Sequence, residues 1–497
     1  MKAMTRRQVE ATVAAARERG ESPNLSNVDL AGVDLNFANL SGANLTKADL
    51  TGADLTGANL WGANLYGAKL DSAKLGGTGL SGAFLTGANL FEVDLSSAEL
   101  HSVNLKGANL TQAKLTDADL YEANLASANL TGANLEGANL EGANLTGANL
   151  EGANLHGADL FDVDLADANL TGANLSSANL SDTNLEAAKL GGAKLDGAKL
   201  GGAYLEYANL TDANLKDATL KGATLIDAKL GGADLTGADL TRADLQGATL
   251  KGANLAGANL DEADLANTIL EGAGLSGAFL ANTNLEGANL TGAQLQHACS
   301  GCIVGEPAAL PSDWLLMKGY LVGPSADLLG ADLAGADLTR AKLTEAYLAD
   351  ANLTGANLTG VDLHSADLTD ANLQGADLKY ANLAGANLTG VDLPPNALTN
   401  STITDKQWKK GKVGPTNVTG DRLRELRDAA TTTDLAGLKK YARAGAIGVR
   451  MAAASNEACP EELLMKLISD KREEVRQAVL ANPNCTDAVR VVAALQP

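Results

Sequence analysis

The sequence predicts a mainly β fold, a long four-cornered solenoid with a leucine core, carrying helical segments at its ends. From Leu25 to Leu295 every fifth residue is leucine, which makes fifty-five in succession. Two residues before each leucine stands a small residue, nearly always Ala. Only 3% of the 497 residues are aromatic, so the core must be built from leucine and alanine instead of large rings.

A period of five excludes the two common ways of burying leucine. Five residues of α-helix turn through about 500°, so successive leucines would point in every direction. In a flat strand, residues five apart lie on opposite faces. A chain that bends after each leucine keeps both the leucine and the small residue on the inside. The Gly-rich pair that follows each leucine suits such a corner, because Gly adopts positive φ at little cost.

Four corners close one coil of twenty residues, so the first block of repeats forms about 14 coils stacked roughly 4.8 Å apart. Small residues at the second inward position let the walls approach, and a bulky side chain there would overpack the coil. The pattern Ala-(Asn/Asp)-Leu-x-x resembles the pentapeptide-repeat family over most of the chain. That resemblance implies a right-handed quadrilateral β-helix.

The order of the elements follows from the repeats. Residues 1–24 are expected to hold a helix, from Thr5 to Arg19, that caps the first coil, because an open solenoid end exposes unpaired strand edges. The repeats occupy 25–299, and residues 300–325 interrupt them as a loop or short hairpin that contains Trp314. A second block at 326–398 is expected to stack on the first.

The C-terminal part has another character. Residues 399–420 form a polar linker, and residues 421–497 are expected to be four or five short helices. A period of 26 residues appears there, since Val449-Arg450 recurs as Val475-Arg476 and Cys459 as Cys485. This pattern resembles leucine-rich-repeat-variant and HEAT-like helical repeats, which implies a small protein-binding α-solenoid.

No catalytic, cofactor or metal site is predicted. The four histidines lie at outward positions of separate coils, too far apart for a nucleophile or a metal centre: His101, His156, His297 and His364. Cys299 and Cys302 have the spacing of half a zinc site, and the other half is missing. Cys459 and Cys485 are expected to be small buried thiols.

The formal net charge of −22 disfavours direct binding of nucleic acid or of an anionic membrane and favours a basic protein partner. The N-terminal segment is charged and has no apolar run of signal-peptide length, and no stretch approaches the length of a membrane span. Four cysteines in a chain of this length do not form a disulfide framework. We therefore expect a cytoplasmic protein.

Acidic residues gather on two adjacent sides of the predicted rod. With four repeats per coil, those two sides carry thirteen of the twenty net negative charges of the first block. The predicted acidic binding face includes Asp159, Asp162, Asp164, Asp167, Asp182 and Glu186. The alternative is an acidic surface that serves only solubility. Trp61, Tyr121 and Phe161 fall in one column with His101 and suggest an aromatic contact stripe.

Two functions remain open at this point, and neither is enzymatic. Known members of the family resemble DNA and bind type II topoisomerases, so the resemblance implies a DNA mimic that interacts with DNA gyrase or topoisomerase IV and protects it from inhibitors. The alternative is a rigid scaffold or adaptor that recruits proteins through the insert and the C-terminal helical repeats. The oligomeric state is left open.

Overall fold

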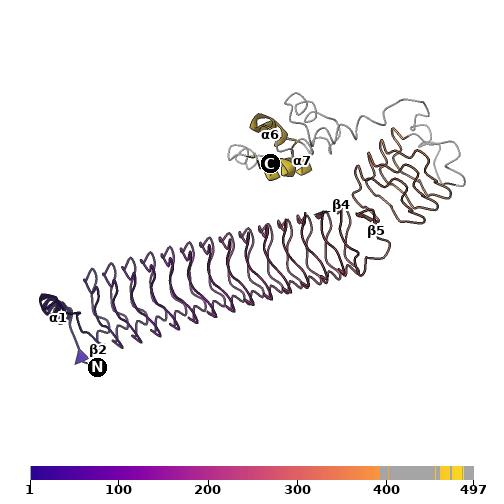
Figure 1. The fold of residues 1–497 in the computed structure, drawn as a ribbon. Coiled ribbons are helices and arrows are strands. Elements are labelled where there is room, and N and C mark those ends of the chain that lie inside the picture. Colours follow the sequence, from indigo (N-terminus) through magenta and orange to yellow (C-terminus); the bar gives the residue numbers. More distant parts are fainter. Residues whose placement is uncertain are drawn as a thin grey trace. The chain divides into compact units, whose positions relative to one another are not determined.

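The computed structural model describes residues 2–391, 401, 454, 459–470, 473–483 and 485. The chain divides into two compact units, Met1–Gly319 and Tyr320–Pro497, which are considered one at a time. In the first unit, coils follow one another from the N-terminal helix α1 to strand β4 (Figure 1).

The solenoid of the first unit is defined by parallel bridges between residues twenty apart. Asn44 bridges Asn64, for example, and Asp49 bridges Lys69. The bridges recur at every fifth residue, so each coil of twenty residues has four short sides. Backbone hydrogen bonds run in both directions between neighbouring coils: Leu25 N–H donates to the Asn44 carbonyl (2.7 Å), and Asn44 N–H donates to the Pro23 carbonyl (2.7 Å). The four-sided parallel solenoid predicted from the period is confirmed.

The core consists of the residues that the repeat marked as inward. All fifty-five leucines from Leu25 to Leu295 are at most 1% exposed. The small residues before them are buried as well, with Val33 on the first coil as an exception. Where threonine replaces alanine, the hydroxyl is satisfied: Thr78 Oγ1 donates to the Leu55 carbonyl (2.9 Å) and Thr183 Oγ1 to the Leu160 carbonyl (2.7 Å). The buried hydroxyl groups at these sites therefore all have a hydrogen-bond partner.

Each corner is a tight turn that closes from leucine to the next small residue. Ala43 N–H donates to the Leu40 carbonyl at 3.0 Å, and Gly42 between them has φ +63°. Positive φ at the third residue is the type II pattern, for which Gly has no Cβ penalty. The same position takes Asp, Ser or Asn in other repeats, as Asp117 with φ 53° illustrates, because these residues tolerate the left-handed region better than most.

The N-terminal segment covers the first coil in two ways. Strand β1 (Lys2–Ala3) pairs in parallel with β2 (Val28–Asp29) and so occupies an edge that the solenoid would otherwise expose. Helix α1 (Arg6–Glu18) begins with a capping box between Thr5 and Gln8.

Helix α1 contacts the first coil through apolar side chains and through hydrogen bonds. Its inner face buries Val9, Val13 and Ala16. Two arginines that flank this face reach coil residues: Arg6 Nη1 donates to Asn36 Oδ1 (2.9 Å), and Arg17 Nη2 donates to Asn39 Oδ1 (2.8 Å). Both the apolar burial and these bonds hold the helix against the first coil.

The ladder of the first unit continues beyond the last leucine. Strand β3 (Phe279–Ala281) pairs in parallel with β4 (Cys299–Gly301), and the bridges Asn284↔Val304 and Asn289↔Ala309 extend the coil into the insert. Val304 is followed by Gly305 in place of a leucine, whereas Ala309 is followed by Leu310, three repeats after Leu295. Backbone pairing to the coil before therefore continues where the leucine is missing.

The insert then leaves the ladder. Strand β5 (Leu315–Met317) is followed by Lys318 and Gly319, both with positive φ, and then by β6 (Tyr320–Val322). Two successive residues with positive φ are typical of a type I′ hairpin turn. Trp314 is only 7% exposed, so it is not available as a docking side chain.

The second unit contains its own coils. Bridges between residues twenty apart run from Asp327↔Tyr347 to Asp367↔Asn387, and Leu328 to Leu388 are buried at each fifth position. The stacking of this block on the first one stays a prediction. The linker at 399–420, Leu398 and most of 421–497 lie outside the described residues.

Two helices are described in the C-terminal region, α6 (Glu461–Leu467) and α7 (Glu473–Ala481). Their buried residues are Leu463, Leu464, Leu467, Val475 and Val479. No helix in the described ranges is long and apolar enough to cross a bilayer. The further helices expected there, and their resemblance to helical repeats, stay predictions.

Candidate binding surface

The outward residue of each short strand carries a repeating side-chain bond. Its Oδ1 accepts the backbone N–H two residues later, as Asn44 does from Thr46 (3.1 Å) and Asp54 from Thr56 (3.1 Å). Many of these side chains also bond to the next coil: Asn109 Nδ2 donates to Asn89 Oδ1 at 2.8 Å. This explains why the repeat prefers Asn or Asp before leucine, since a short polar side chain closes the corner locally.

Two residues of the predicted acidic face belong to this structural ladder. Asp159 Oδ1 accepts Phe161 N–H (3.1 Å) and Asn179 Nδ2 (2.8 Å). Asp164 accepts Asn184 Nδ2 at Oδ1 (3.1 Å) and the Thr146 hydroxyl at Oδ2 (2.9 Å). Both side chains are half-buried. Their carboxylates add negative charge to the surface, and they also hold neighbouring coils together.

The other four predicted acids stand at corners and are exposed. Asp162, Asp167 and Asp182 have φ of 55°, 57° and 56°, the corner position that Gly fills in most repeats. Asp162 and Asp182 lie on adjacent coils of one corner, whereas Asp167 and Glu186 lie on the next corner round the coil. The six predicted acids are therefore spread over two corners, the side between them (Asp164) and the side before the first corner (Asp159).

The ladder groups Asp159 and Asp162 of the predicted face with four further acids that sequence reasoning had not named. We give the name acidic edge to one corner of the solenoid, with the strand residue just before it, on four successive coils. It comprises residues 99, 101 and 102 and the residues 20, 40 and 60 positions after each of them. Its six carboxylates are Glu99, Asp119, Glu122, Glu141, Asp159 and Asp162, and no Lys or Arg stands among them. Sorting by twenty had already indicated this side as acidic, and following one corner from coil to coil finds the individual residues.

The acidic edge also carries three rings. His101 Nε2 lies 2.6 Å from Asp119 Oδ2, and the His101 and Tyr121 rings meet edge to face with centroids 6.2 Å apart. A hydrogen bond to the Glu122 carboxylate, together with the charges of Glu122 and Glu141, raises the pKa of Tyr121 above its ordinary value. Phe161, the third ring, is exposed.

The aromatic column predicted from the sequence is real but interrupted. Trp61, Tyr121 and Phe161 stand at the same corner position, and they are 64%, 36% and 38% exposed. Ser81 and His101 separate Trp61 from Tyr121. Only Tyr121 and Phe161 belong to the acidic edge.

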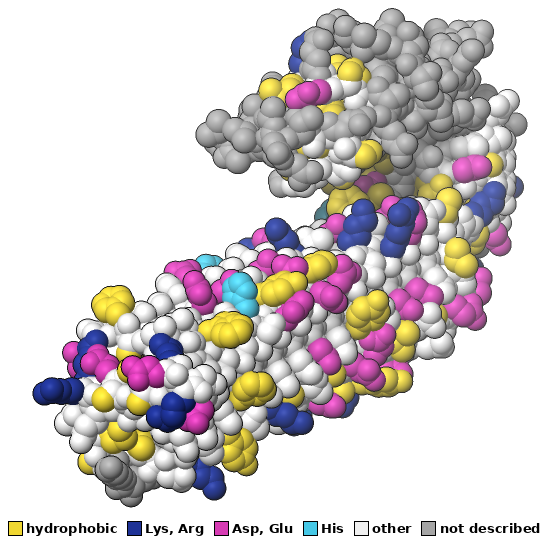
Figure 2. Space-filling view, turned by 60° about the vertical axis from the view of Figure 1, so that its left-hand side comes forward, with side chains coloured by type: hydrophobic (Ala, Val, Ile, Leu, Met, Phe, Trp, Pro, Cys, Tyr) yellow, Lys and Arg dark blue, Asp and Glu magenta, His cyan; other side chains and the backbone are white. Residues whose placement is uncertain are grey.

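The other sides of the solenoid neutralise part of their charge. Lysines reach acids on the preceding coil in Lys69–Asp49 (3.5 Å), Lys74–Asp54 (3.8 Å) and Lys114–Asp94 (4.0 Å). Asp and Glu side chains outnumber Lys and Arg along the body of the first unit in the view of Figure 2. The acidic edge differs from the sides that carry these pairs because its six acids have no Lys or Arg among them.

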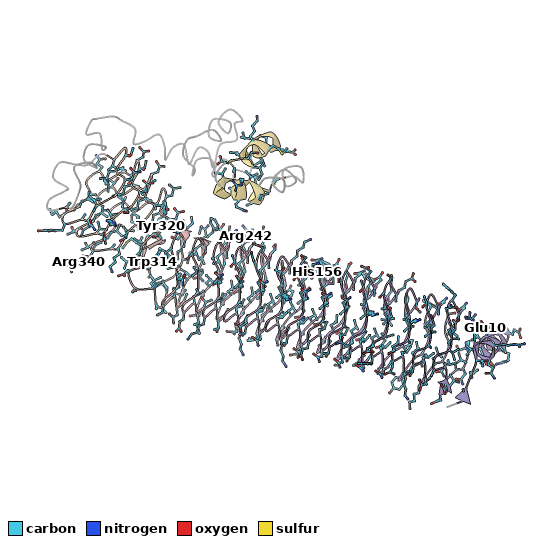
Figure 3. The ribbon with its side chains drawn as sticks, turned by 180° about the vertical axis from the view of Figure 1, so that it is seen from behind. Glu10, His156, Arg242, Trp314, Tyr320 and Arg340 are labelled. Carbon is cyan, nitrogen blue, oxygen red and sulfur yellow. The ribbon has the colours of Figure 1, made fainter. Side chains whose placement is uncertain are left out.

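The thiols and imidazoles are placed as predicted. All four histidines are exposed, and Figure 3 labels His156 on one of the coils. Cys459 and Cys485 are buried, and burial raises the pKa of the Cys459 thiol to about 11. Cys302 is exposed and Cys299 half-buried. Within the described ranges no three His, Cys, Asp or Glu side chains are grouped so that they could hold a metal.

Together these features define a class: a parallel β-solenoid built from five-residue repeats, with a leucine and alanine core and an open polar surface. The model of the family described as pentapeptide repeats matches segments that together span residues 24–299 and 325–393. The chain belongs to the pentapeptide-repeat family.

Solved structures of the same kind are found, whereas no curated protein matches. Rfr23 from the cyanobacterium Cyanothece 51142 is 40% identical over 20% of this chain and 64% of its own, with a TM-score of 0.18. HetL, a protein involved in heterocyst differentiation regulation from Nostoc sp. strain PCC 7120, is 30% identical over 61% of this chain and 97% of its own, with a TM-score of 0.17. QnrB1, a plasmid-mediated fluoroquinolone resistance protein, is 19% identical over 40% of this chain and 86% of its own, with a TM-score of 0.24.

Proposed function

We propose that this protein is a non-catalytic binding protein whose acidic edge occupies the DNA-binding groove of a basic protein, with a type II topoisomerase such as DNA gyrase as the partner. The single observation that carries the proposal is the run of six carboxylates, from Glu99 to Asp162, without a Lys or Arg among them.

The charge density of the acidic edge supports mimicry of DNA. Its six carboxylates extend over three steps between coils, about 14 Å. That is roughly one negative charge per 2–3 Å, close to the value of about one per 1.7 Å along duplex DNA. A rigid solenoid holds these charges in place, so a basic groove that binds it loses little entropy in ordering them.

The rings of the acidic edge suit a cationic partner for a second reason. Tyr121 and Phe161 expose aromatic faces between carboxylates, and a guanidinium or ammonium group binds favourably over such a face. An Arg or Lys side chain entering the edge would therefore meet a carboxylate and a ring together.

We propose the cytoplasm as the location, where such a partner acts.

The test compares two triple variants that make the same change in net charge. Glu99→Lys, Glu122→Lys and Asp162→Lys reverse exposed residues of the acidic edge, whereas Asp117→Lys, Asp212→Lys and Asp217→Lys reverse exposed corner residues on the other sides. Asp159 and Asp164 are left alone because their carboxylates hold coils together.

Binding of purified gyrase to the wild type should weaken as salt rises and should be competed by duplex DNA, because carboxylates would replace phosphates in the groove. The edge variant should lose about tenfold or more in affinity, and the control variant much less. A supercoiling assay with and without a quinolone then reports protection. Equal losses in both variants would reveal only a diffuse charge effect, and no binding at low salt would remove the topoisomerase and leave the scaffold alternative.

A further inference from the structure

One side of the solenoid near its N-terminal end carries exposed rings that the fold does not require. Trp61, Tyr66 and Phe84 are 64%, 51% and 53% exposed. Trp61 and Tyr66 stand at the two corners that bound one side of a coil, and Phe84 lies between those corners on the next coil, bridged to Asn64. Thr is the commonest residue at the corner position of Trp61 and Tyr66, and Asn is the commonest at the strand position of Phe84. We name Trp61, Tyr66 and Phe84, with Asn64 and Asn104, the aromatic side.

The aromatic side is uncharged in a chain of net charge −22. From Ser41 to Lys106, the outward residues of this side and its two corners include no Asp or Glu. The charged ones are Lys47 and Lys106, both on one corner and on coils that flank the rings. No carboxylate accompanies the rings on this side, whereas Lys47 lies one coil before Tyr66 at the same corner. The absence of acids here sets this side apart from the acidic surface and suits a ligand without positive charge, such as a neutral one.

Amide donors lie beside the rings. Asn64 Oδ1 accepts Tyr66 N–H (3.0 Å), and Asn104 Oδ1 accepts Lys106 N–H (3.2 Å). In the described part of the chain, the Nδ2 groups of both residues make no hydrogen bond. Elsewhere in the ladder an Asn donates to the side chain of its bridge partner, as Asn109 Nδ2 does to Asn89 Oδ1. Phe84 is a bridge partner of Asn64 and of Asn104, and its side chain has no acceptor. Each free amide can donate to a ligand oxygen.

The rings do not form a cluster. The one ring pair in the described residues is His101 with Tyr121, so the three rings of the aromatic side stand apart with amides between them. A protein hot spot groups its aromatic residues in one desolvated centre. Trp61 and Tyr66 lie on one coil, five residues apart, and Phe84 lies on the next coil. Separate rings with amide donors beside them suit a ligand that presents both flat apolar faces and hydroxyl groups.

We propose that the aromatic side binds a neutral oligosaccharide. The C–H faces of hexose rings would pack on Trp61, Tyr66 and Phe84, whose ring faces carry the negative part of the aromatic quadrupole. Hydroxyl oxygens would accept from Asn64 Nδ2 and Asn104 Nδ2. This site shares no residue with the acidic edge, and the proposal does not depend on the topoisomerase.

The variants use residues that the repeat already tolerates. Phe84→Asn, Tyr66→Thr and Trp61→Thr restore common residues of the repeat, and Asn104→Asp keeps the corner acceptor while it removes the donor. The matched control is Tyr204→Asn, because Tyr204 holds the same strand position as Phe84 six coils further on and is 52% exposed. A thermal melt of each variant verifies the fold.

Calorimetric titrations of the full chain should use cellohexaose, chitohexaose and maltohexaose, with an oligoguluronate as the anionic probe. We expect saturable binding of at least one neutral hexamer, weakened about tenfold by Phe84→Asn or Trp61→Thr and unchanged by Tyr204→Asn. Asn104→Asp should weaken it as well. Absence of binding by all three neutral hexamers, equal loss in the Tyr204 control, or tighter binding of the oligoguluronate would overturn the proposal.

Discussion

At the scale of single residues, each of the five repeat positions has one physical task. The leucine and the small residue fill the interior, the Asn or Asp closes the corner through its side chain, and the next two residues make the turn. The leucine and small positions are almost invariant along the first block, whereas the corner positions carry Phe, Tyr, Trp and most of the acids. Function can therefore be placed only on the outward positions.

An inward alanine cannot be replaced by a larger side chain without steric strain. Ala148 is 1% exposed and stands where opposite walls approach. Changing Ala148→Leu should destabilise the protein by about 1–3 kcal/mol through overpacking. Glu151→Ala, an exposed corner residue three positions later, should be nearly neutral. Denaturant unfolding followed by circular dichroism measures both, and equal midpoints for the two variants would contradict the packing argument.

The thiol of Cys459 should resist alkylation. Because burial raises its pKa to about 11, the folded state keeps the thiol protonated where an unfolded thiol, with a pKa of about 8.5, has lost its proton. This group therefore lowers the free energy of unfolding as pH rises from about 8.5 towards 11.

Iodoacetamide at pH 8.5, read by mass spectrometry, should label the exposed Cys302 well before Cys459. Addition of denaturant should remove the difference. Comparable labelling rates in the native protein would show that Cys459 is accessible.

At the scale of elements, the N-terminal segment closes an end that the repeat alone leaves open. Strand β1 pairs with the first coil and helix α1 buries Val9, Val13 and Ala16 over it. The helix was predicted from its charge pattern, and its limits agree within a residue. The pairing of β1 was not predicted, because two residues carry no periodic signal.

Removing the apolar contact of α1 should expose that end. Val13→Asp places a charge under the helix, so we expect a lower melting temperature and association through the freed strand edge. Ala14→Asp is the matched control, since Ala14 is exposed on the same helix. Light scattering after gel filtration reports the association. A monomeric Val13→Asp variant with an unchanged melt would mean that β1 and the arginine contacts suffice.

At the scale of the whole molecule, the core and the surface follow different periods. The interior repeats every five residues, whereas neighbours on the surface are twenty residues apart. A deletion of five residues leaves the core pattern unchanged and rotates everything after it by one side. A deletion of twenty residues keeps every column in place.

This difference predicts a separation of folding from binding. Deleting residues 126–130 should give a folded solenoid. In it Asp159, Phe161 and Asp162 would no longer lie on the same side as Glu99 and Tyr121. Deleting residues 126–145 should keep those columns aligned, although it removes Glu141. Both variants should show β circular dichroism and similar melts, and the shorter deletion should weaken binding of the basic partner more. Equal binding would refute the alignment of the acidic edge as the cause.

The sequence by itself determined the solenoid, its buried leucines and its corners, because a period of five has one solution that buries every leucine and local turn chemistry supports it. It also indicated the acidic sides and the column of Trp61, Tyr121 and Phe161. Only the tertiary structure decided what each acid does. Asp159 and Asp164 bond across coils, Asp162 stands free at a corner, and Glu99 joins Glu122 through stacking of residues more than twenty apart. The physical reason is that the pattern of neighbouring residues determines which side chains are buried, whereas the surface consists of side chains that meet only after the coils have stacked.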